Sequence, residues 1–279
     1  MALLAAGHLG TDFANGALPA LLPFLVDRFA LSYTLAATPL VVAFGLRGGF
    51  LLAVPCLAVA AALLAGAPFL RSFVSDGEAR VRQATGEDRR GAMALLLGVI
   101  AFRSLAWFGL ITFVPLWEVS LGHSKADGNR LLALMLLTGG LGTIVAGPAA
   151  DRFGRRPVLL ASLVATAPLI LVFVLVGGIP GAIALAVVGA CVIGTFGVTM
   201  VMSQEYLPRH IGMASGLAIG LSIGLGGVAA VALGAVADAI DLRTALYVCA
   251  AAPVVAVLLA LPLPSSRAGR RLQVEPVVP

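Results

Sequence analysis

Two neighbouring stretches decide the fold class: VLLASLVATAPLILVFVLV at residues 158–176 and AIALAVVGACVIGTFGVTMVM at residues 182–202. Neither stretch contains a charged residue. Each is close to the length of about 20 apolar residues that a helix needs to cross roughly 30 Å of hydrocarbon. The two stretches and the short connection at 177–181 therefore predict a pair of transmembrane helices.

The composition extends this prediction to the whole chain. Of the 279 residues, 60% are hydrophobic and 11% are charged, whereas a soluble domain carries about 25% charged residues. Segments of about 10 residues with alternating polarity, the pattern of a β-barrel, are not found. We therefore predict an all-α, polytopic bundle in the lipid bilayer. The predicted spans are roughly 3–26, 48–69, 93–117, 131–150, 157–176, 181–203, 211–237 and 244–263.

The charge pattern predicts the orientation in the membrane. The formal charge is +5, but the arginines occur in short clusters between apolar stretches and form no single stripe, which argues against a nucleic-acid partner. Basic residues mark alternate connections, as the positive-inside rule requires. The rule places residues 70–92, 151–156 and 204–210 and the C-terminus in the cytoplasm. With the N-terminus also expected there, we predict a multi-pass protein of the cell inner (plasma) membrane. Residues 34–46 are too short to cross alone and are expected to be interfacial or a kinked extension.

The sharpest local motif is GPAADRFGRR at residues 147–156. Gly147 permits a close helix contact, Gly154 permits a tight turn, and Asp151 can accept hydrogen bonds from a neighbouring helix N-terminus while pairing with arginine. An ordinary basic loop needs only the arginines. The added glycine and aspartate spacing favours a contact that locks the cytoplasmic side and breaks when that side opens. The arginines of this predicted gate are Arg152, Arg155 and Arg156.

Ionisable residues inside predicted spans are candidates for function, because a charge at mid-bilayer costs at least about 2.5 kcal/mol without compensation. His8 and Asp12 lie four residues apart on one face of the first span. Desolvation can bring either group into a range where it exchanges protons, so the pair is a candidate proton-coupling site. The alternative is that Asp12 is hydrated near the cytoplasmic end or caps a distorted helix.

Arg103 lies near the middle of the span 93–117, beside Trp107. A guanidinium there could bind an anionic group through two parallel hydrogen bonds, with Trp107 as a neighbouring contact. The alternative is a structural pair with an acid elsewhere in the bundle. Both interpretations stay open.

Two further features lie after residue 203, one in the connection that follows the span 181–203 and one in the span 211–237. Glu205 and Arg209 are expected to make a cytoplasmic loop contact. Glycines repeat every fourth residue from 212 to 224, which predicts a face that another helix can approach closely.

Several function classes are excluded. There is no G-x-x-x-x-G-K-[ST] sequence for an ATP-driven pump, no His or Cys cluster with metal spacing, and no serine with an evident base. Cys56, Cys191 and Cys249 each lie alone in apolar stretches. We therefore predict no enzyme activity, no cofactor and no metal site.

The longer pattern resembles a known family. FRSLAWFGLITFVPLW (102–117), GPAADRFGRRPVLLASLVATAPL (147–169) and SQEYLPRHIGMASGLAIGLSIGLGG (203–227) are similar to the second half of the fosmidomycin resistance branch of the major facilitator superfamily. The resemblance covers about residues 93–263. It implies proton-coupled export of a small drug-like or anionic solute by alternating access. In that mechanism His8 and Asp12 carry the proton, and Arg103 contacts the substrate.

The first part of the chain resembles only pieces of that family's first half. GHLGTDFANGALPALLPFL (7–25) and FALSYTLAA (29–37) are similar to its first span and the start of its second, and FGLRGGFLLAVPCLAVAAALL (44–64) to its sixth. The resemblance thus implies an internal deletion of four helices, which leaves about eight spans. The solute path would then be open to lipid, and association into a homo-oligomer could close it. The alternative is a transport-inactive remnant or a regulatory partner of an intact transporter. The predicted domains are 1–70, a remnant bundle; 71–92, a linker; 93–263, a six-helix bundle; and 264–279, a tail.

Overall fold

The computed structural model describes residues 86–265, and all regular secondary structure in that range is helical. The elements are α5 (Arg90–Ser120), α6 (Lys125–Phe153), α7 (Arg155–Val176), α8 (Gly178–Gly194), α9 (Phe196–Tyr206), the 3-10 helix η1 (Pro208–His210), α10 (Ile211–Ala239) and α11 (Leu242–Ala260). When α8 is joined with α9 and η1 with α10, this range contains six helical segments long and apolar enough to cross a membrane. The six spans predicted after residue 92 are confirmed. The predictions for residues 1–85 and for most of the tail 264–279 lie outside the described residues.

Local sequence explains where several helices begin. Helix α6 has a side-chain cap, because Ser124 Oγ accepts a hydrogen bond from the Asp127 N–H at 3.2 Å. Helix α11 starts in the same way, with the Thr244 N–H donating to Asp241 Oδ1 at 2.6 Å. Between α6 and α7 only Gly154 intervenes, at φ +93°, a conformation that side chains with a Cβ rarely adopt.

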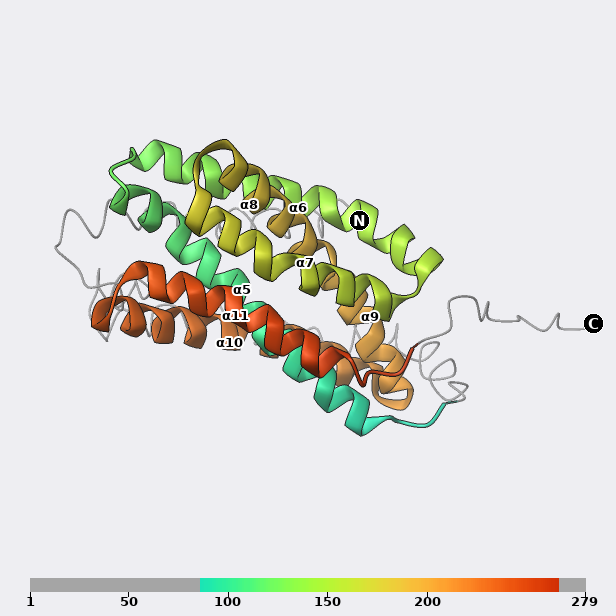
Figure 1. The fold of residues 1–279 in the computed structure, drawn as a ribbon. Coiled ribbons are helices and arrows are strands. Elements are labelled where there is room, and N and C mark those ends of the chain that lie inside the picture. The colour runs from blue at the N-terminus through green and yellow to red at the C-terminus, as the bar shows by residue number, and fades with distance from the viewer. Residues whose placement is uncertain (1–85, 266–279) are drawn as a thin grey trace, which may run out of the picture.

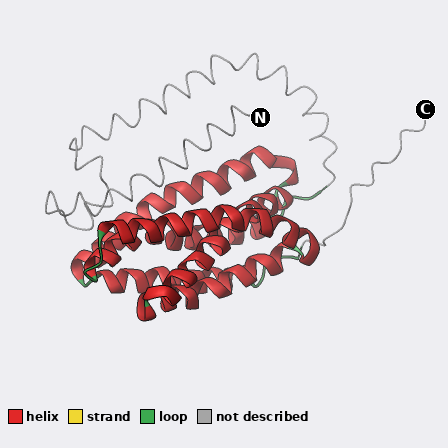
Figure 2. Ribbon diagram, turned by 90° about the horizontal axis from the view of Figure 1, so that it is seen from above, coloured by secondary structure: helices red, strands yellow, loops and turns green. Residues whose placement is uncertain are grey.

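The helices form two groups of three, if α8 and α9 are counted together. Helix α5 packs against α10 and α11, whereas α6 and α7 both pack against α8. In Figure 1, α6, α7 and α8 lie above α10 and α11, and α9 descends toward the lower helices, where it contacts α10. The helices form one bundle when seen from above in Figure 2. Contacts of α5 with α6 and of α7 with α11 join the groups. The bundle therefore has an interior to which both groups contribute.

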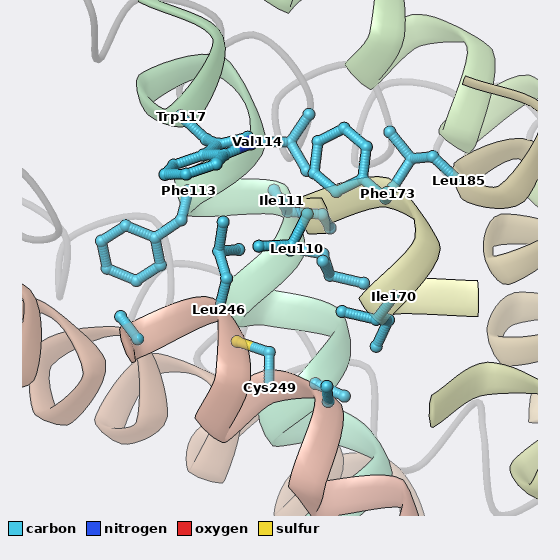
Figure 3. Close-up of a cluster of buried hydrophobic side chains, with 14 of the residues drawn as sticks. Leu110, Ile111, Phe113, Val114, Trp117, Ile170, Phe173, Leu185, Leu246 and Cys249 are labelled. Atoms are coloured by element: carbon cyan, nitrogen blue, oxygen red, sulfur yellow. The ribbon is translucent and has the colours of Figure 1, made fainter. Parts of the chain in front are cut away.

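Two apolar clusters fill that interior. The first cluster, part of which is drawn in Figure 3, joins Leu110 and Phe113 of α5 to Phe173 of α7 and Leu246 of α11. The second cluster lies toward the opposite end of the bundle and includes Leu96, Leu159, Leu163, Met202 and Ala218. Helix α5 contributes its later part to the first cluster and its earlier part to the second. This division leaves a level between them that the apolar clusters do not occupy.

Glycines permit the closest helix contact, between α6 and α8. A Cβ added to Gly189 would lie 2.1 Å from the Met135 carbonyl oxygen, and one added to Gly142 would lie 2.4 Å from the Ala190 carbonyl oxygen. By contrast, a Cβ on any of the four glycines spaced from 212 to 224 would meet no described atom within 4 Å. The close approach predicted for that face of α10 is therefore not made within the described bundle.

Candidate functional site

A layer of buried polar side chains lies between the two apolar clusters. Arg103 falls between Ile100 of the second cluster and Ala106 of the first. On α7 the members Ser162 and Thr166 lie on either side of Leu163, the last second-cluster residue of that helix. Every member is less than a tenth exposed. We call this set the polar layer: Arg103, Ser104, Ser162, Thr166, Thr195 and Ser222. Polar groups are costly at this depth, so their concentration at one level marks the candidate site.

Arg103 is the charged member of the layer and is only 4% exposed. Its Nη1 donates hydrogen bonds to the Val192 carbonyl oxygen at 3.3 Å and to Thr195 Oγ1 at 3.5 Å. Its guanidinium carbon lies 5.7 Å from the centroid of the Phe196 ring, close enough for a cation–π contact. Trp107, the aromatic neighbour predicted from the sequence, packs partly buried against the first cluster.

No carboxylate among residues 86–265 forms an ion pair with Arg103. The sequence left open whether Arg103 forms a structural ion pair with an acid elsewhere in the bundle. No such ion pair is found in the described bundle. Both hydrogen bonds are longer than the 2.7–2.9 Å that is usual for charge-assisted bonds to oxygen anions. The guanidinium is buried with weak compensation from the described residues.

The polar layer coincides with a break in a transmembrane segment. The sequence predicted one helix over 181–203, but α8 ends at Gly194 and α9 begins at Phe196. Thr195, at the break, donates from its hydroxyl to the Cys191 carbonyl oxygen at 2.9 Å. The same hydroxyl oxygen accepts from Ser162 of α7 at 3.5 Å as well as from Arg103 of α5. One hydroxyl thus connects three parts of the bundle.

Sequence reasoning missed this break because the apolar stretch continues through it. The available signal was local: glycines at 189, 194 and 197 surround Thr195, and glycine weakens a helix interior. A second link in the layer was also missed. Ser104 Oγ of α5 and Ser222 Oγ of α10 share a hydrogen bond of 2.7 Å.

The end of the bundle that carries the arginine-rich motif is held by contacts between distant helix ends. Arg155, at the start of α7, forms an ion pair with Glu205 near the end of α9. Arg156 donates from Nη2 to the Leu261 carbonyl oxygen after α11. Glu205, for which the sequence predicted a cytoplasmic loop contact with Arg209, is paired from within α9 with an arginine of the predicted gate.

Other residues of the predicted gate are placed differently from what the sequence suggested. Asp151 is exposed and has no hydrogen bond or ion pair with any described residue. The guanidinium carbon of Arg152 lies 5.4 Å from the Phe153 ring centroid. A Cβ added to Gly147 would meet no described atom within 4 Å, so the expected close helix contact is absent from this part of the chain. Within the described residues, Arg155 and Arg156 make the contacts, while the gating role itself stays a prediction.

At the same end, Asp88 connects the segment before α5 to the turn before α10. Asp88 Oδ1 accepts from the Arg209 N–H at 3.2 Å, and Oδ2 lies 2.6 Å from His210 Nδ1. Arg209 Nε donates to the Gly86 carbonyl oxygen at 3.1 Å. Partial burial, the largest single influence, raises the pKa of the Asp88 carboxyl, but the hydrogen bonds and charges of Arg209 and His210 together outweigh it and lower the pKa.

The opposite end carries a pair that the sequence reasoning missed. Glu118 is buried at the end of α5, and its Oε2 lies 2.6 Å from Nδ1 of His123. Beside it, the Arg243 guanidinium carbon lies 5.5 Å from the Trp117 ring centroid. The only signal was an acid and a histidine five residues apart where the apolar stretch ends.

The described residues thus form six membrane-length helices, with buried polar side chains between two apolar clusters. Residues 96–277, more than half of the chain, match the sequence profile of the Major Facilitator Superfamily. The chain belongs to the Major Facilitator Superfamily. Members of this family are membrane transporters, so the chain is a multi-pass membrane protein of a transporter family.

Two curated relatives support the resemblance drawn from the sequence. The chain is 39% identical over 144 residues to the uncharacterized MFS-type transporter YfnC of Bacillus subtilis (strain 168), a match covering 52% of this chain and 35% of that protein. It is 32% identical over 146 residues to the fosmidomycin resistance protein of Escherichia coli (strain K12), covering 52% of this chain and 36% of that protein. The match spans about a third of the length of each relative.

Proposed function

We propose that this chain serves secondary active transport of a small anionic or drug-like solute, coupled to protons, across the inner membrane by alternating access. The observation that carries the proposal is the buried guanidinium of Arg103 in the polar layer, without an acidic partner in the described bundle. A charged side chain at this depth is expensive and marks a functional site by default. A solute that supplies the negative charge absent from the described bundle is the simplest compensation.

The chemistry of the layer fits an anion with several oxygen atoms. Guanidinium presents five N–H donors in a rigid fork that matches carboxylate, phosphate or phosphonate groups, and the described contacts occupy only Nη1. The Ser162 hydroxyl, whose oxygen lies 3.5 Å from Thr195 Oγ1, can add a neutral hydrogen bond to the anion. One relative is named for resistance to fosmidomycin, a phosphonate, which supports this solute class for the present chain.

The remaining roles in the proposal come from the sequence. His8 and Asp12 are proposed to carry the proton, although both lie outside the described residues. Arg155 and Arg156, which hold the ends of α7, α9 and α11 together, are proposed to act with Asp151 and Arg152 in closing the cytoplasmic side. Both termini are proposed to be cytoplasmic, which would put the Arg155–Glu205 pair on that side.

Equilibrium binding of fosmidomycin to the purified chain in nanodiscs tests the role of Arg103. Arg103→Gln is expected to weaken binding at least tenfold, because a buried charge-assisted contact is lost. Arg103→Lys keeps the charge without the fork and is expected to restore only part of the affinity. Arg130→Gln, at an exposed ion pair, is the control and should bind as the wild type does. Equal affinity for fosmidomycin in the wild type and all three variants would refute the proposal.

A second candidate function is a transport-inactive remnant or a regulatory partner of an intact transporter. The observation favouring it is that the matches extend over only about a third of either relative. Family members transport through the interface between two six-helix halves, so a curtailed first half would expose that path unless copies associate. This alternative predicts solute binding weak or absent and no flux, whereas a homo-oligomer predicts flux together with an assembled species larger than one chain.

A further inference from the structure

The break between α8 and α9 does more than interrupt a transmembrane helix. In a continuous helix the carbonyl of residue 192 accepts a hydrogen bond from the N–H four residues later. Here the Val192 carbonyl oxygen lies within hydrogen-bond distance of Arg103 Nη1, at 3.3 Å, and of Thr195 Oγ1, at 3.4 Å. Side chains thus serve backbone groups freed at the break, which is required in a membrane interior.

The guanidinium also suits this position electrostatically. The carbonyl groups at the C-terminal end of α8 carry partial negative charge, which favours a cation beside them. Among the described residues, Arg103 is therefore held by one end of a helix rather than by a full counter-charge. Since an anionic solute offers stronger, charge-assisted acceptors than a carbonyl and a hydroxyl, it can compete with both for the same donors.

The surroundings limit how the break can respond. On one side it is braced, because a Cβ on Gly194 would lie 2.8 Å from the Gly142 carbonyl oxygen of α6. On the other side Phe196, the first residue of α9, is 39% exposed while its ring lies against the Arg103 guanidinium. The start of α9 therefore has one face at the surface of the described bundle and contacts Arg103 through the other.

We propose that the α8–α9 break is a ligand-operated joint, in which Thr195 and the Val192 carbonyl hold Arg103 until a phosphonate or phosphate anion displaces them and changes the backbone at the break. Thr195 is in this role a positioning residue that sets the affinity for the anion. The inference rests on the proposed function of Arg103 as the anion contact. It adds that binding the anion and rearranging one transmembrane segment are the same event.

The first test is an affinity comparison at Thr195 in the full chain in nanodiscs, with fosmidomycin and inorganic phosphate as probes. Thr195→Val removes the competing hydroxyl and is expected to tighten binding by about three- to tenfold, the scale of one typical hydrogen bond. Thr195→Ser retains a hydroxyl and should bind as the wild type does. The matched control is Thr199→Val, one turn later in α9, whose hydroxyl donates only to the Phe196 carbonyl oxygen at 2.9 Å and should leave affinity unchanged.

The second test does not depend on the Thr195 variants folding. Amide hydrogen exchange of the wild-type chain, with and without saturating fosmidomycin, is expected to change in peptides covering residues 190–200 and to stay constant in peptides from the middle of α7. Arg103→Gln should show no such change. If binding requires Arg103 but exchange near the break is unaffected, or if Thr195→Val binds no tighter than Thr199→Val, the joint is wrong while the anion contact stands. If binding does not require Arg103, the proposed function itself fails.

Discussion

Glu205 and Asp151 are two acids near the same arginine-rich motif, but only one has a partner in the described structure. Glu205 pairs with Arg155, and both side chains are partly exposed, so the pair is worth at most about 1 kcal/mol. Glu205→Gln is therefore expected to lower the thermal midpoint in detergent by no more than about 4 °C. Asp151→Asn, the matched control, should leave the midpoint unchanged. A larger loss from Asp151→Asn than from Glu205→Gln would contradict the assigned contacts.

Asp241 gives a prediction about pH. The hydrogen bond from the Thr244 N–H, the largest influence, lowers the pKa of the Asp241 carboxyl below its ordinary value. A carboxyl with a lowered pKa in the folded state stabilises that state above its unfolded pKa, and this contribution is lost as pH falls through the folded pKa. Asp241→Asn retains a good cap without a titrating group. Thermal midpoints measured from neutral pH to about pH 3 should fall less steeply for Asp241→Asn than for the wild type. Parallel curves would refute this role.

Single residues also show what the sequence could predict. Arg103 was found from the sequence because a charge in an apolar stretch is conspicuous. Its contacts with Val192 and Thr195 were not, since they lie about 90 positions away and depend on packing. The same reason hides the partner of Glu205. Sequence reasoning thus located charged groups better than their partners.

Among the helices, the α6–α8 contact depends on the absence of side chains. Gly142→Ala would place a Cβ 2.4 Å from the Ala190 carbonyl oxygen, so the backbones must separate. We expect a clear loss of thermal stability, on the order of 1–3 kcal/mol, as for overpacked interiors. Gly140→Ala, in the same helix, meets no described atom within 4 Å and should be neutral or slightly stabilising. Denaturation of both variants in the same detergent measures the difference; equal stability would show that the contact is looser than described.

The helices themselves were predictable because hydropathy over about 20 residues reports burial in lipid. Gly154, at φ +93°, lies at the turn where the sequence placed one. The break at Thr195 was not predicted, and no helix within residues 86–265 approaches the glycine face of α10 closely. A window of that length cannot detect a one-residue interruption, and a glycine repeat shows that a helix could approach without showing that one does.

The whole bundle has one end rich in arginine, which sets the expected orientation. With the native cysteines replaced, Leu121→Cys and Phe153→Cys place exposed thiols at opposite ends of the described bundle. In intact cells, a membrane-impermeant maleimide should label Leu121→Cys and should label Phe153→Cys only after permeabilisation. The reverse pattern would invert the topology and move the Arg155–Glu205 pair to the outside.

Family membership follows from six described spans and the profile match, whereas activity rests on parts of the chain beyond residues 86–265. The most direct measurement is fosmidomycin flux into proteoliposomes containing the purified 28.3 kDa chain, with and without an imposed pH gradient. We predict flux that requires the gradient, is lost in Asp12→Asn and Arg103→Gln, and persists in Arg130→Gln, with all proteins reconstituted equally. Absence of gradient-dependent flux in the wild-type chain would contradict transport and favour the remnant or regulatory partner.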